Sequence, residues 1–244
     1  MGTASIRERL VLDHFYIPAT AEELAALAPI VYRFRDAVHR TVVSGDDHWE
    51  GVYLEAVVYP GASNLGLAFS PAQPQYTDAG LIESEFPDLS WKKGTRLDED
   101  RKPWFDWISL VDAEPVVPPP VNAWVMRYHF THMRERSAPT GPRTVDRFKV
   151  IRLDAGAESI PEIRALVPWL PGTQVWEKDR ALLALPLSDG HAFRVEISIA
   201  AGKAPLTFRS LEMEITRGQV AEPGTFGRFL LSRPDEHTAV LEKR

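Results

Sequence analysis

Two residues in the first quarter of the chain have side chains that can hold a metal ion or move a proton. His14 lies in an extended run over residues 9–17, and Glu55 lies in a second extended run over residues 49–59. Imidazole nitrogens and carboxylate oxygens are common ligands of divalent metals, and a carboxylate can also act as a general base. If the two runs are neighbouring strands, His14 and Glu55 predict a metal site or an acid–base site.

Both residues also have a structural interpretation. His14 could be a core histidine that is hydrogen-bonded to a neighbour. Glu55 could point to solvent in a salt bridge, which contributes little to stability. If Glu55 is buried, its carboxylate needs a metal or a cation such as Arg127, because an unpaired buried charge is costly. The sequence leaves these alternatives open.

A third ligand could come from the extended run over residues 123–131. His129 and His132 are three positions apart, so strand alternation sends them to opposite faces and only one can join a site. Together with His14 and Glu55, either would complete a set of two histidines and one carboxylate, which leaves open coordination positions on Fe(II) and similar ions. An exposed histidine pair at the strand end is the alternative.

Aromatic residues near these runs could line a substrate pocket. Tyr53, Trp104 and Trp124 lie in three different extended runs, and Arg127 adds a charged group close to Trp124. Large rings with a few polar groups suit a planar small molecule. The same rings are also typical of a plain hydrophobic core.

The composition excludes several classes of site and partner. The 244 residues include no cysteine, which excludes disulfides, zinc–thiolate sites and thiol nucleophiles. A net charge of −6 without a basic cluster argues against nucleic acid. No run approaches the ~20 apolar residues of a membrane span, and no signal region precedes Leu10. We therefore expect a cytoplasmic protein that binds a small-molecule ligand, and a homodimer is compatible with the sequence.

Residue periodicity predicts an α+β fold. Along the first strand, 9–17, strict alternation would place His14 with Leu12 on one face and Phe15 on the other. A capping box at Thr20 predicts a helix through about residue 34, and a second helix is expected at 160–166. Further strands are expected at 37–43, 49–59, 64–70, 103–111, 123–131, 148–153, 173–177, 181–187, 192–199 and 206–215.

The second half of the chain repeats the order of elements of the first half. Glu196 lies 141 positions after Glu55, in a similar local pattern. This weak repeat predicts two halves, residues 1–135 with the candidate site and residues 136–244 as a degenerate copy packed on it. Glu196 and His191 are interpreted as surface strand residues, because the matching first strand carries Arg152 and no histidine.

The order of strands and helices resembles the vicinal oxygen chelate superfamily, which includes glyoxalase I, bleomycin-resistance proteins and extradiol dioxygenases. The segments that carry the resemblance are Leu12–Tyr16, Trp49–Glu55, Asn64–Phe69, Pro103–Phe105 and Trp124–His129. The resemblance implies paired βαβββ modules whose curved mixed β-sheets form a cup. It also implies that His14, Glu55 and His129 hold a divalent metal (Fe, Zn, Mn or Ni).

The resemblance implies a metal-dependent enzyme of glyoxalase or dioxygenase type that acts on an oxygenated, aromatic substrate. Two alternatives come from the same superfamily. One is a metal-free protein that binds or sequesters a small molecule. The other is a metal-free lyase or isomerase with Glu55 as its general base. The sequence departs from the family pattern at strand 64–69, which offers no histidine or glutamate.

Overall fold

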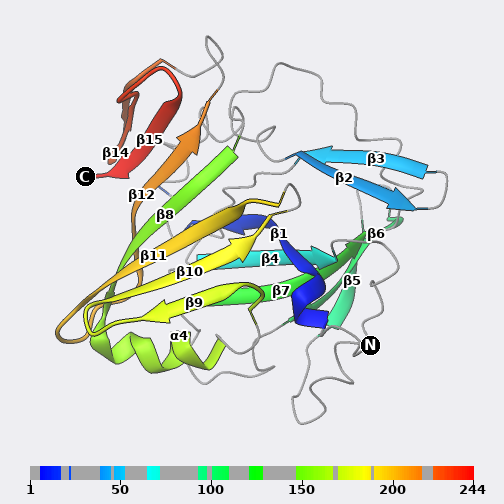
Figure 1. Ribbon diagram of the computed structural model, residues 1–244, viewed down its shortest axis with the longest axis horizontal. Helices are drawn as coiled ribbons and strands as arrows, with labels where there is room; N and C mark the ends of the chain where they lie inside the picture. Colours follow the sequence, from blue (N-terminus) through cyan, green and yellow to red (C-terminus); the bar gives the residue numbers. More distant parts are fainter. Residues whose placement is uncertain are drawn as a thin grey trace.

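The computed structural model describes residues 6–17, 22, 39–44, 47–52, 65–71, 93–97, 101–109, 121–128, 147–166, 170–187, 190–215 and 222–244, and these form three β-sheets (Figure 1). Helix within these residues is confined to α4 (Ile160–Leu166), the 3-10 turns η1 (Ile6–Arg9) and η3 (Ala157–Ser159), and Glu22. The expected mixed sheets are confirmed, whereas the described part of the chain is mainly β rather than α+β. The helix expected over 21–34 lies outside it except for Glu22, which is helical.

The first sheet has five strands in the order β1-β4-β7-β6-β5. Its strands are β1 (Leu10–Tyr16), β4 (Leu65–Pro71), β5 (Lys93–Leu97), β6 (Pro103–Ser109) and β7 (Val121–Tyr128). Strands β4 and β7 are parallel, and the other neighbours are antiparallel. A separate hairpin joins β2 (His39–Ser44) and β3 (Asp47–Val52). The structure describes no side chains of this hairpin.

The second sheet has eight strands in the order β13-β14-β15-β12-β8-β11-β10-β9. Its strands are β8 (Arg147–Gly156), β9 (Thr173–Trp176), β10 (Arg180–Pro186), β11 (Ala192–Ala200), β12 (Thr207–Glu214), β13 (Gly224–Phe226), β14 (Phe229–Ser232) and β15 (Thr238–Lys243). Strands β8 and β11 are parallel, which requires a crossover connection. Helix α4 lies within that connection, as expected for residues 160–166.

Helix α4 is amphipathic, with one face buried in the core and the other exposed. Ile160 and Ile163 are buried in the core, whereas Glu162 and Arg164 are exposed. The spacing of the two isoleucines places them on one helix face. The guanidinium of Arg164 lies 4.8 Å from the ring centroid of Trp176, which ties the exposed face of the helix to β9.

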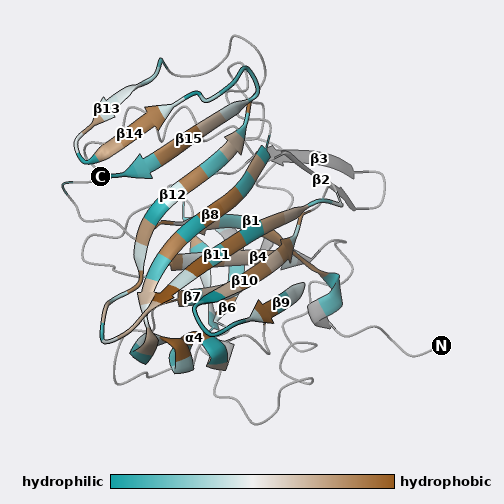
Figure 2. Cartoon of the chain, turned by 60° about the vertical axis from the view of Figure 1, so that its left-hand side comes forward, coloured by the Kyte–Doolittle hydropathy of each residue, from teal (hydrophilic) through white to brown (hydrophobic). Residues whose placement is uncertain are grey.

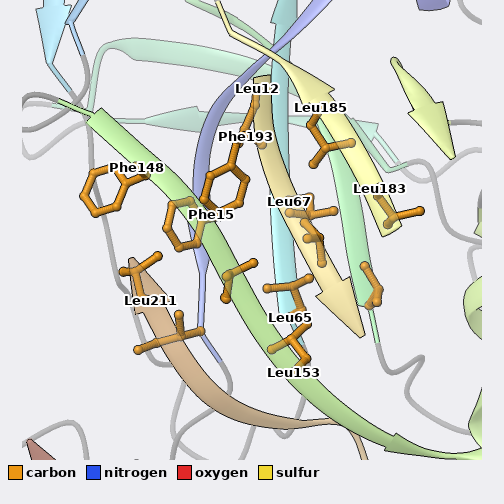
Figure 3. Packing of buried hydrophobic residues seen from close by; sticks show 14 of the residues in the cluster. Leu12, Phe15, Leu65, Leu67, Phe148, Leu153, Leu183, Leu185, Phe193 and Leu211 are labelled. Carbon is orange, nitrogen blue, oxygen red and sulfur yellow. The ribbon is translucent and has the colours of Figure 1, made fainter. Parts of the chain in front are cut away.

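The hydrophobic core lies between the five-stranded and eight-stranded sheets (Figure 3). Phe15 of β1 stacks on Phe193 of β11 and meets Phe148 of β8 edge-on, with ring centroids 4.7 Å and 5.5 Å away. Apolar and polar residues alternate along the strands of the larger sheet, so its other face is polar (Figure 2). Each fully buried large side chain stabilises the fold by about 1.5–3 kcal/mol.

Strand β1 contains a β-bulge that the sequence pattern does not reveal. Leu12 pairs with Phe69 and His14 pairs with Ala68, so Asp13 is an extra residue with no partner position on β4. A bulge of this kind places two successive side chains on one side of the sheet and bends the strand. The predicted strict alternation along 9–17 is therefore wrong.

The bulge reassigns the faces of β1. Phe15 and Ile17 join Leu12 in the core between the sheets, although strict alternation would separate Phe15 from Leu12. Asp13 and His14 both turn to the opposite face of the five-stranded sheet. One inserted residue thus lets β1 supply large apolar groups to the core and two polar side chains to a single place outside it.

Four strands were absent from the sequence prediction. Strand β5 carries lysine and arginine and is almost entirely exposed at the sheet edge, so it lacks the apolar alternation that predicts a strand. Strands β13 to β15 are short and extend the eight-stranded sheet beyond β12. No helix in the described residues is long and apolar enough to cross a membrane.

Candidate functional site

Three buried polar side chains meet on the face of the five-stranded sheet that is turned away from the core. Asp13 and His14 come from the bulge in β1, and Ser70 comes from β4. Their exposed fractions are 5%, 6% and 1%. Polar groups are rarely buried this deeply unless they are hydrogen-bonded, so their partners define what the cluster can do. We call these three residues the polar trio.

The carboxylate of Asp13 is the centre of the polar trio. Its Oδ1 lies 3.0 Å from Nδ1 of His14, and its Oδ2 accepts a hydrogen bond of 2.8 Å from the hydroxyl of Ser70. An ionised carboxylate only accepts hydrogen bonds, so a hydrogen bond between it and His14 requires the proton to be on Nδ1. The neutral imidazole then has its lone pair on Nε2, the nitrogen that can bind a metal or accept a proton.

Trp124 of β7 fixes the other side of the imidazole. The two rings meet edge to face, with centroids 5.9 Å apart and planes at 65°. His14, Ala68 and Trp124 lie in one row across β1, β4 and β7. The two rings can meet because Ala68, between them, has only a methyl group. A larger residue at position 68 would stand between the rings.

The structure describes only some of the predicted site residues. Glu55, Tyr53, His129 and His132 lie outside the described residues. Trp104 and Arg127 are on β6 and β7, where their backbone alone is described. His14, a predicted metal ligand, and Trp124, a predicted pocket residue, lie in contact. Asp13 and Ser70 were missed, although an aspartate beside a histidine in an apolar strand is a visible signal.

The described residues do not supply a complete metal site. Among them, no three or more histidine, aspartate and glutamate side chains are grouped closely enough to hold an ion. Asp13 is engaged by His14 and Ser70 and is suited to orient the imidazole rather than to bind a metal itself. Further ligands to a metal at His14 would come from residues beyond those described.

Comparison with protein-family models and with curated proteins gave no match. Among solved structures, an extradiol ring-cleaving dioxygenase from B. fuscum is similar at a TM-score of 0.36 and 13% identity, covering 94% of this chain and 70% of that one. A catechol 2,3-dioxygenase is similar at a TM-score of 0.28 and 10% identity, covering 92% and 98%. At these scores the likeness assigns no activity and no residue to this chain.

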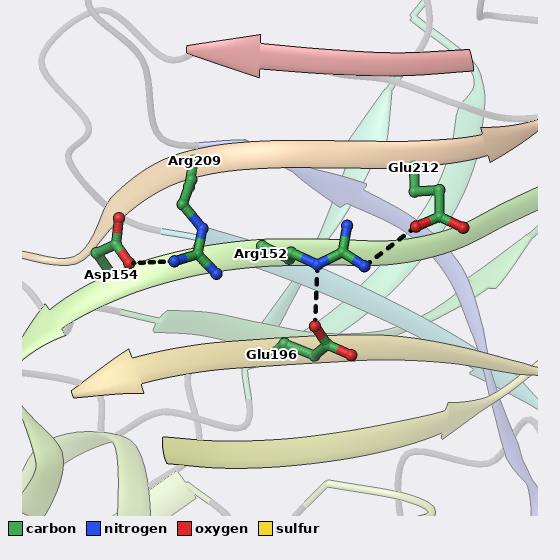
Figure 4. A network of polar contacts seen from close by, with 5 residues as sticks. All are labelled: Arg152, Asp154, Glu196, Arg209 and Glu212. Carbon is green, nitrogen blue, oxygen red and sulfur yellow. Dashed lines mark hydrogen bonds and ion pairs between the residues drawn. The ribbon is translucent and has the colours of Figure 1, made fainter. Parts of the chain in front are cut away.

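The polar face of the eight-stranded sheet carries a network of ion pairs (Figure 4). Arg152 of β8 donates through Nε to Glu196 of β11 at 3.0 Å and through Nη2 to Glu212 of β12 at 3.1 Å. These side chains are between 23% and 35% exposed, so solvent screens the pairs in part. Glu196 is a surface strand residue, as expected from the sequence, and its partner is Arg152.

The five-stranded and eight-stranded sheets have the same pattern of strand pairing around their bulges. In the eight-stranded sheet Phe208 pairs with Leu153 and Ser210 pairs with Arg152, so Arg209 is the extra residue of β12. Arg209 thus corresponds to Asp13 of β1, and Ser210 corresponds to His14.

The side chain that holds the bulged residue also corresponds. Asp154 follows Leu153 on β8 as Ser70 follows Phe69 on β4, and its Oδ1 accepts from Arg209 Nη1 at 3.1 Å. In both sheets the bulged side chain therefore bonds to the neighbouring-strand residue that pairs with the position two before it, Val11 or Thr207. The eight-stranded sheet has ion pairs where the five-stranded sheet has the polar trio. Only the five-stranded sheet has an imidazole at this place.

Proposed function

We propose that the chain is a metal-dependent enzyme of the vicinal oxygen chelate type, of glyoxalase or dioxygenase class, acting on an oxygenated, aromatic small molecule. The observation that carries the proposal is the contact between Nδ1 of buried His14 and Asp13. Histidines that bind metals usually donate their second ring N–H to a carboxylate or carbonyl, which fixes the tautomer and makes the ligand nitrogen more basic.

In this proposal His14 binds the ion through Nε2, and Glu55 and His129 are the further ligands. A bound divalent ion (Fe, Zn, Mn or Ni) would supply Lewis-acid chemistry to neighbouring oxygens of the substrate. Asp13 holds the proton on Nδ1, and Trp124 holds the ring plane. The rings of Trp124 and His14 would offer an aromatic surface to a planar substrate, with Tyr53, Trp104 and Arg127 as its other contacts.

The proposal extends to the organisation of the chain as paired βαβββ modules. Two sets of four strands support it, because β4-β7-β6-β5 and β8-β11-β10-β9 have the same order and the same parallel pair. The division into residues 1–135 and 136–244 follows this pairing. A cytoplasmic location, a homodimer and the lack of a nucleic-acid partner stay predictions of the sequence.

A metal-free lyase or isomerase is the second candidate. An imidazole that is oriented by a carboxylate is also suited to act as a general base, because the carboxylate stabilises the charged ring that forms on protonation. Glu55 is the other candidate base in this version. A metal-free protein that sequesters its ligand would use the same aromatic surface without needing the Asp13–His14 contact.

Metal content separates these functions. The protein is purified without a histidine tag, offered Fe(II), Zn(II), Mn(II) and Ni(II) separately, and analysed for bound metal. We expect stoichiometric metal in the wild type, its loss in His14→Ala and its retention in His191→Ala. His191 is an exposed histidine just before β11 of the eight-stranded sheet and serves as the matched control. A wild-type protein that retains none of the four ions contradicts the metal-dependent function.

A further inference from the structure

We infer that Ser70 is a positioning residue that sets, through Asp13, which nitrogen of His14 carries the proton. The inference rests on the proposed function, in which Nε2 of His14 is the reactive nitrogen. Ser70 is 57 residues away from Asp13 in the chain and belongs to a different strand. The hydrogen bond that gives it this role goes to the carboxylate of Asp13, so its effect on the imidazole is indirect.

The buried position of Ser70 makes its hydroxyl a specific partner of Asp13. Ser70 is 1% exposed, and its Oγ donates to Asp13 Oδ2 at 2.8 Å. The side chains of Asp13 and His14 are 3% and 7% exposed, so bulk water has little access to the polar trio. A hydrogen bond to a charged group is stronger than one between neutral groups, and it constrains the rotation of the carboxylate.

The orientation of the carboxylate decides the tautomer. With Oδ2 held by Ser70, Oδ1 is aimed at Nδ1 of His14, and this geometry favours the tautomer with the proton on Nδ1. Without the hydroxyl, the carboxylate loses the hydrogen bond that holds its Oδ2 and can turn away from the ring. The imidazole then populates both tautomers, and the tautomer with the proton on Nε2 cannot use that nitrogen as a ligand or base.

The eight-stranded sheet supports this geometric role. Arg209 is the extra residue of its bulge, and Asp154, at the register position of Ser70, binds it at 3.1 Å. The same backbone arrangement therefore brings a bulged side chain to the same neighbour in both sheets. The chemistry differs between the two sheets, because the bulged residue Asp13 also contacts a histidine, His14.

Nitrogen NMR of the imidazole tests the inference without metal or substrate. Full-length protein labelled with ¹⁵N is stripped of metal with a chelator and measured in mildly alkaline buffer. Two-bond couplings from ring protons to the nitrogens distinguish the two tautomers. We expect one tautomer, with the proton on Nδ1, in the wild type and a mixture in Ser70→Ala.

Two variants show whether the hydroxyl is responsible. Ser70→Thr keeps the hydroxyl, and we expect it to restore the wild-type tautomer. Ser210→Ala removes a serine of the other sheet that is also buried, 5% exposed, at the position that corresponds to His14, and we expect no change at His14. A folded Ser70→Ala protein that keeps the single Nδ1 tautomer overturns the inference.

A second variant keeps the test decisive if Ser70→Ala does not fold. Asp13→Asn keeps the shape of the side chain but offers an amide N–H to Nδ1, which favours the tautomer with the proton on Nε2. An unchanged wild-type tautomer in Asp13→Asn would show that the polar trio does not control the ring, which also overturns the inference.

Metal affinity distinguishes a failed inference from a failed function. If Zn(II) binds through His14, Ser70→Ala should weaken its binding about 10- to 100-fold, the usual effect of losing an outer partner of a metal ligand. A tautomer change in a wild-type protein that binds no metal supports the role of Ser70 and contradicts the proposed function. Metal binding at His14 together with an unchanged tautomer in Ser70→Ala supports the proposed function and contradicts the role of Ser70.

Discussion

Phe15 and Phe193 stack across the interface of the two large sheets, with ring centroids 4.7 Å apart and planes at 25°. Each ring is almost fully buried, at 1% and 0% exposed. Phe15 reaches this interface only because the bulge at Asp13 shifts the alternation of β1. The same inserted residue therefore joins the two sheets on one face and assembles the polar trio on the other.

Phe15→Ala should lower the free energy of unfolding by about 3–5 kcal/mol, because it removes a buried ring and leaves a cavity between the sheets. Urea denaturation followed by tryptophan fluorescence measures the change. Phe226→Ala is the matched control, since Phe226 is only partly buried against the core, and its effect should be smaller. Equal effects of the two variants would show that the sheets do not depend on this stack.

Arg152→Met should destabilise the eight-stranded sheet by about 1 kcal/mol, because it leaves Glu196 and Glu212 side by side without their shared cation. Arg209→Met breaks the ion pair with Asp154, whose side chains are more exposed, and should lower the free energy of unfolding by less. Chemical denaturation in urea at low and high salt measures both. The difference between the variants should shrink in high salt, which screens exposed charges. A larger effect for Arg209→Met would contradict the central place of Arg152.

Gly172→Ala should destabilise the fold far more than Gly190→Ala. Both glycines have positive φ, 90° and 82°, so an added side chain strains the backbone at either position. At Gly172 the new Cβ would also collide with the backbone carbonyl of Ala184, whereas no described atom lies within 4 Å at Gly190. We expect about 1 kcal/mol of lost stability for Gly190→Ala and several times that for Gly172→Ala. Thermal denaturation compares them, and similar melting temperatures would contradict the collision.

Asp235 should contribute stability that disappears in acid. The backbone N–H of His237 donates to its carboxylate at 2.7 Å and lowers the pKa of Asp235 below its ordinary value, with a smaller effect from Thr238. A carboxylate whose pKa is lowered by folding stabilises the native state above its unfolded pKa and loses this effect as the pH falls through the folded pKa.

Asp235→Asn tests this pH dependence. The variant should melt below the wild type at neutral pH, and the gap should narrow as the pH falls from about 6 to about 2. Melting temperatures across that range measure the gap. Asp179→Asn, an exposed aspartate in the turn between β9 and β10, controls for loss of a surface charge. A constant gap at Asp235 would contradict the assigned hydrogen bond.

The sequence predicts most strands of the fold because apolar alternation is strong along them. It does not predict β5, whose exposed charged residues carry no such signal. Alternation also fails at Asp13, since a bulge changes the pairing of strands without changing the apolar pattern. The pattern within one strand therefore does not determine its faces; the register against the neighbouring strand does.

The candidate site was predicted in its residue types but not in its contacts. His14 is identifiable because a histidine in an apolar strand needs a reason, and Trp124 because large rings suit a pocket. Their contact depends on Ala68, the small residue that pairs with both. The role of Ser70 depends on a register between residues far apart in the chain, which a single sequence does not reveal. Glu55 and His129 stay predictions.

The matched bulges make the eight-stranded sheet a natural recipient for a transplanted site. The substitutions Arg209→Asp, Ser210→His and Asp154→Ser would place the residues of the polar trio on β12 and β8, at the positions that correspond to those in β1 and β4. A protein engineer would then have two copies of one carboxylate-held imidazole in a single chain, each in different surroundings. The Arg152 ion network, at the position of Ala68, is what such a transplant would first have to remove.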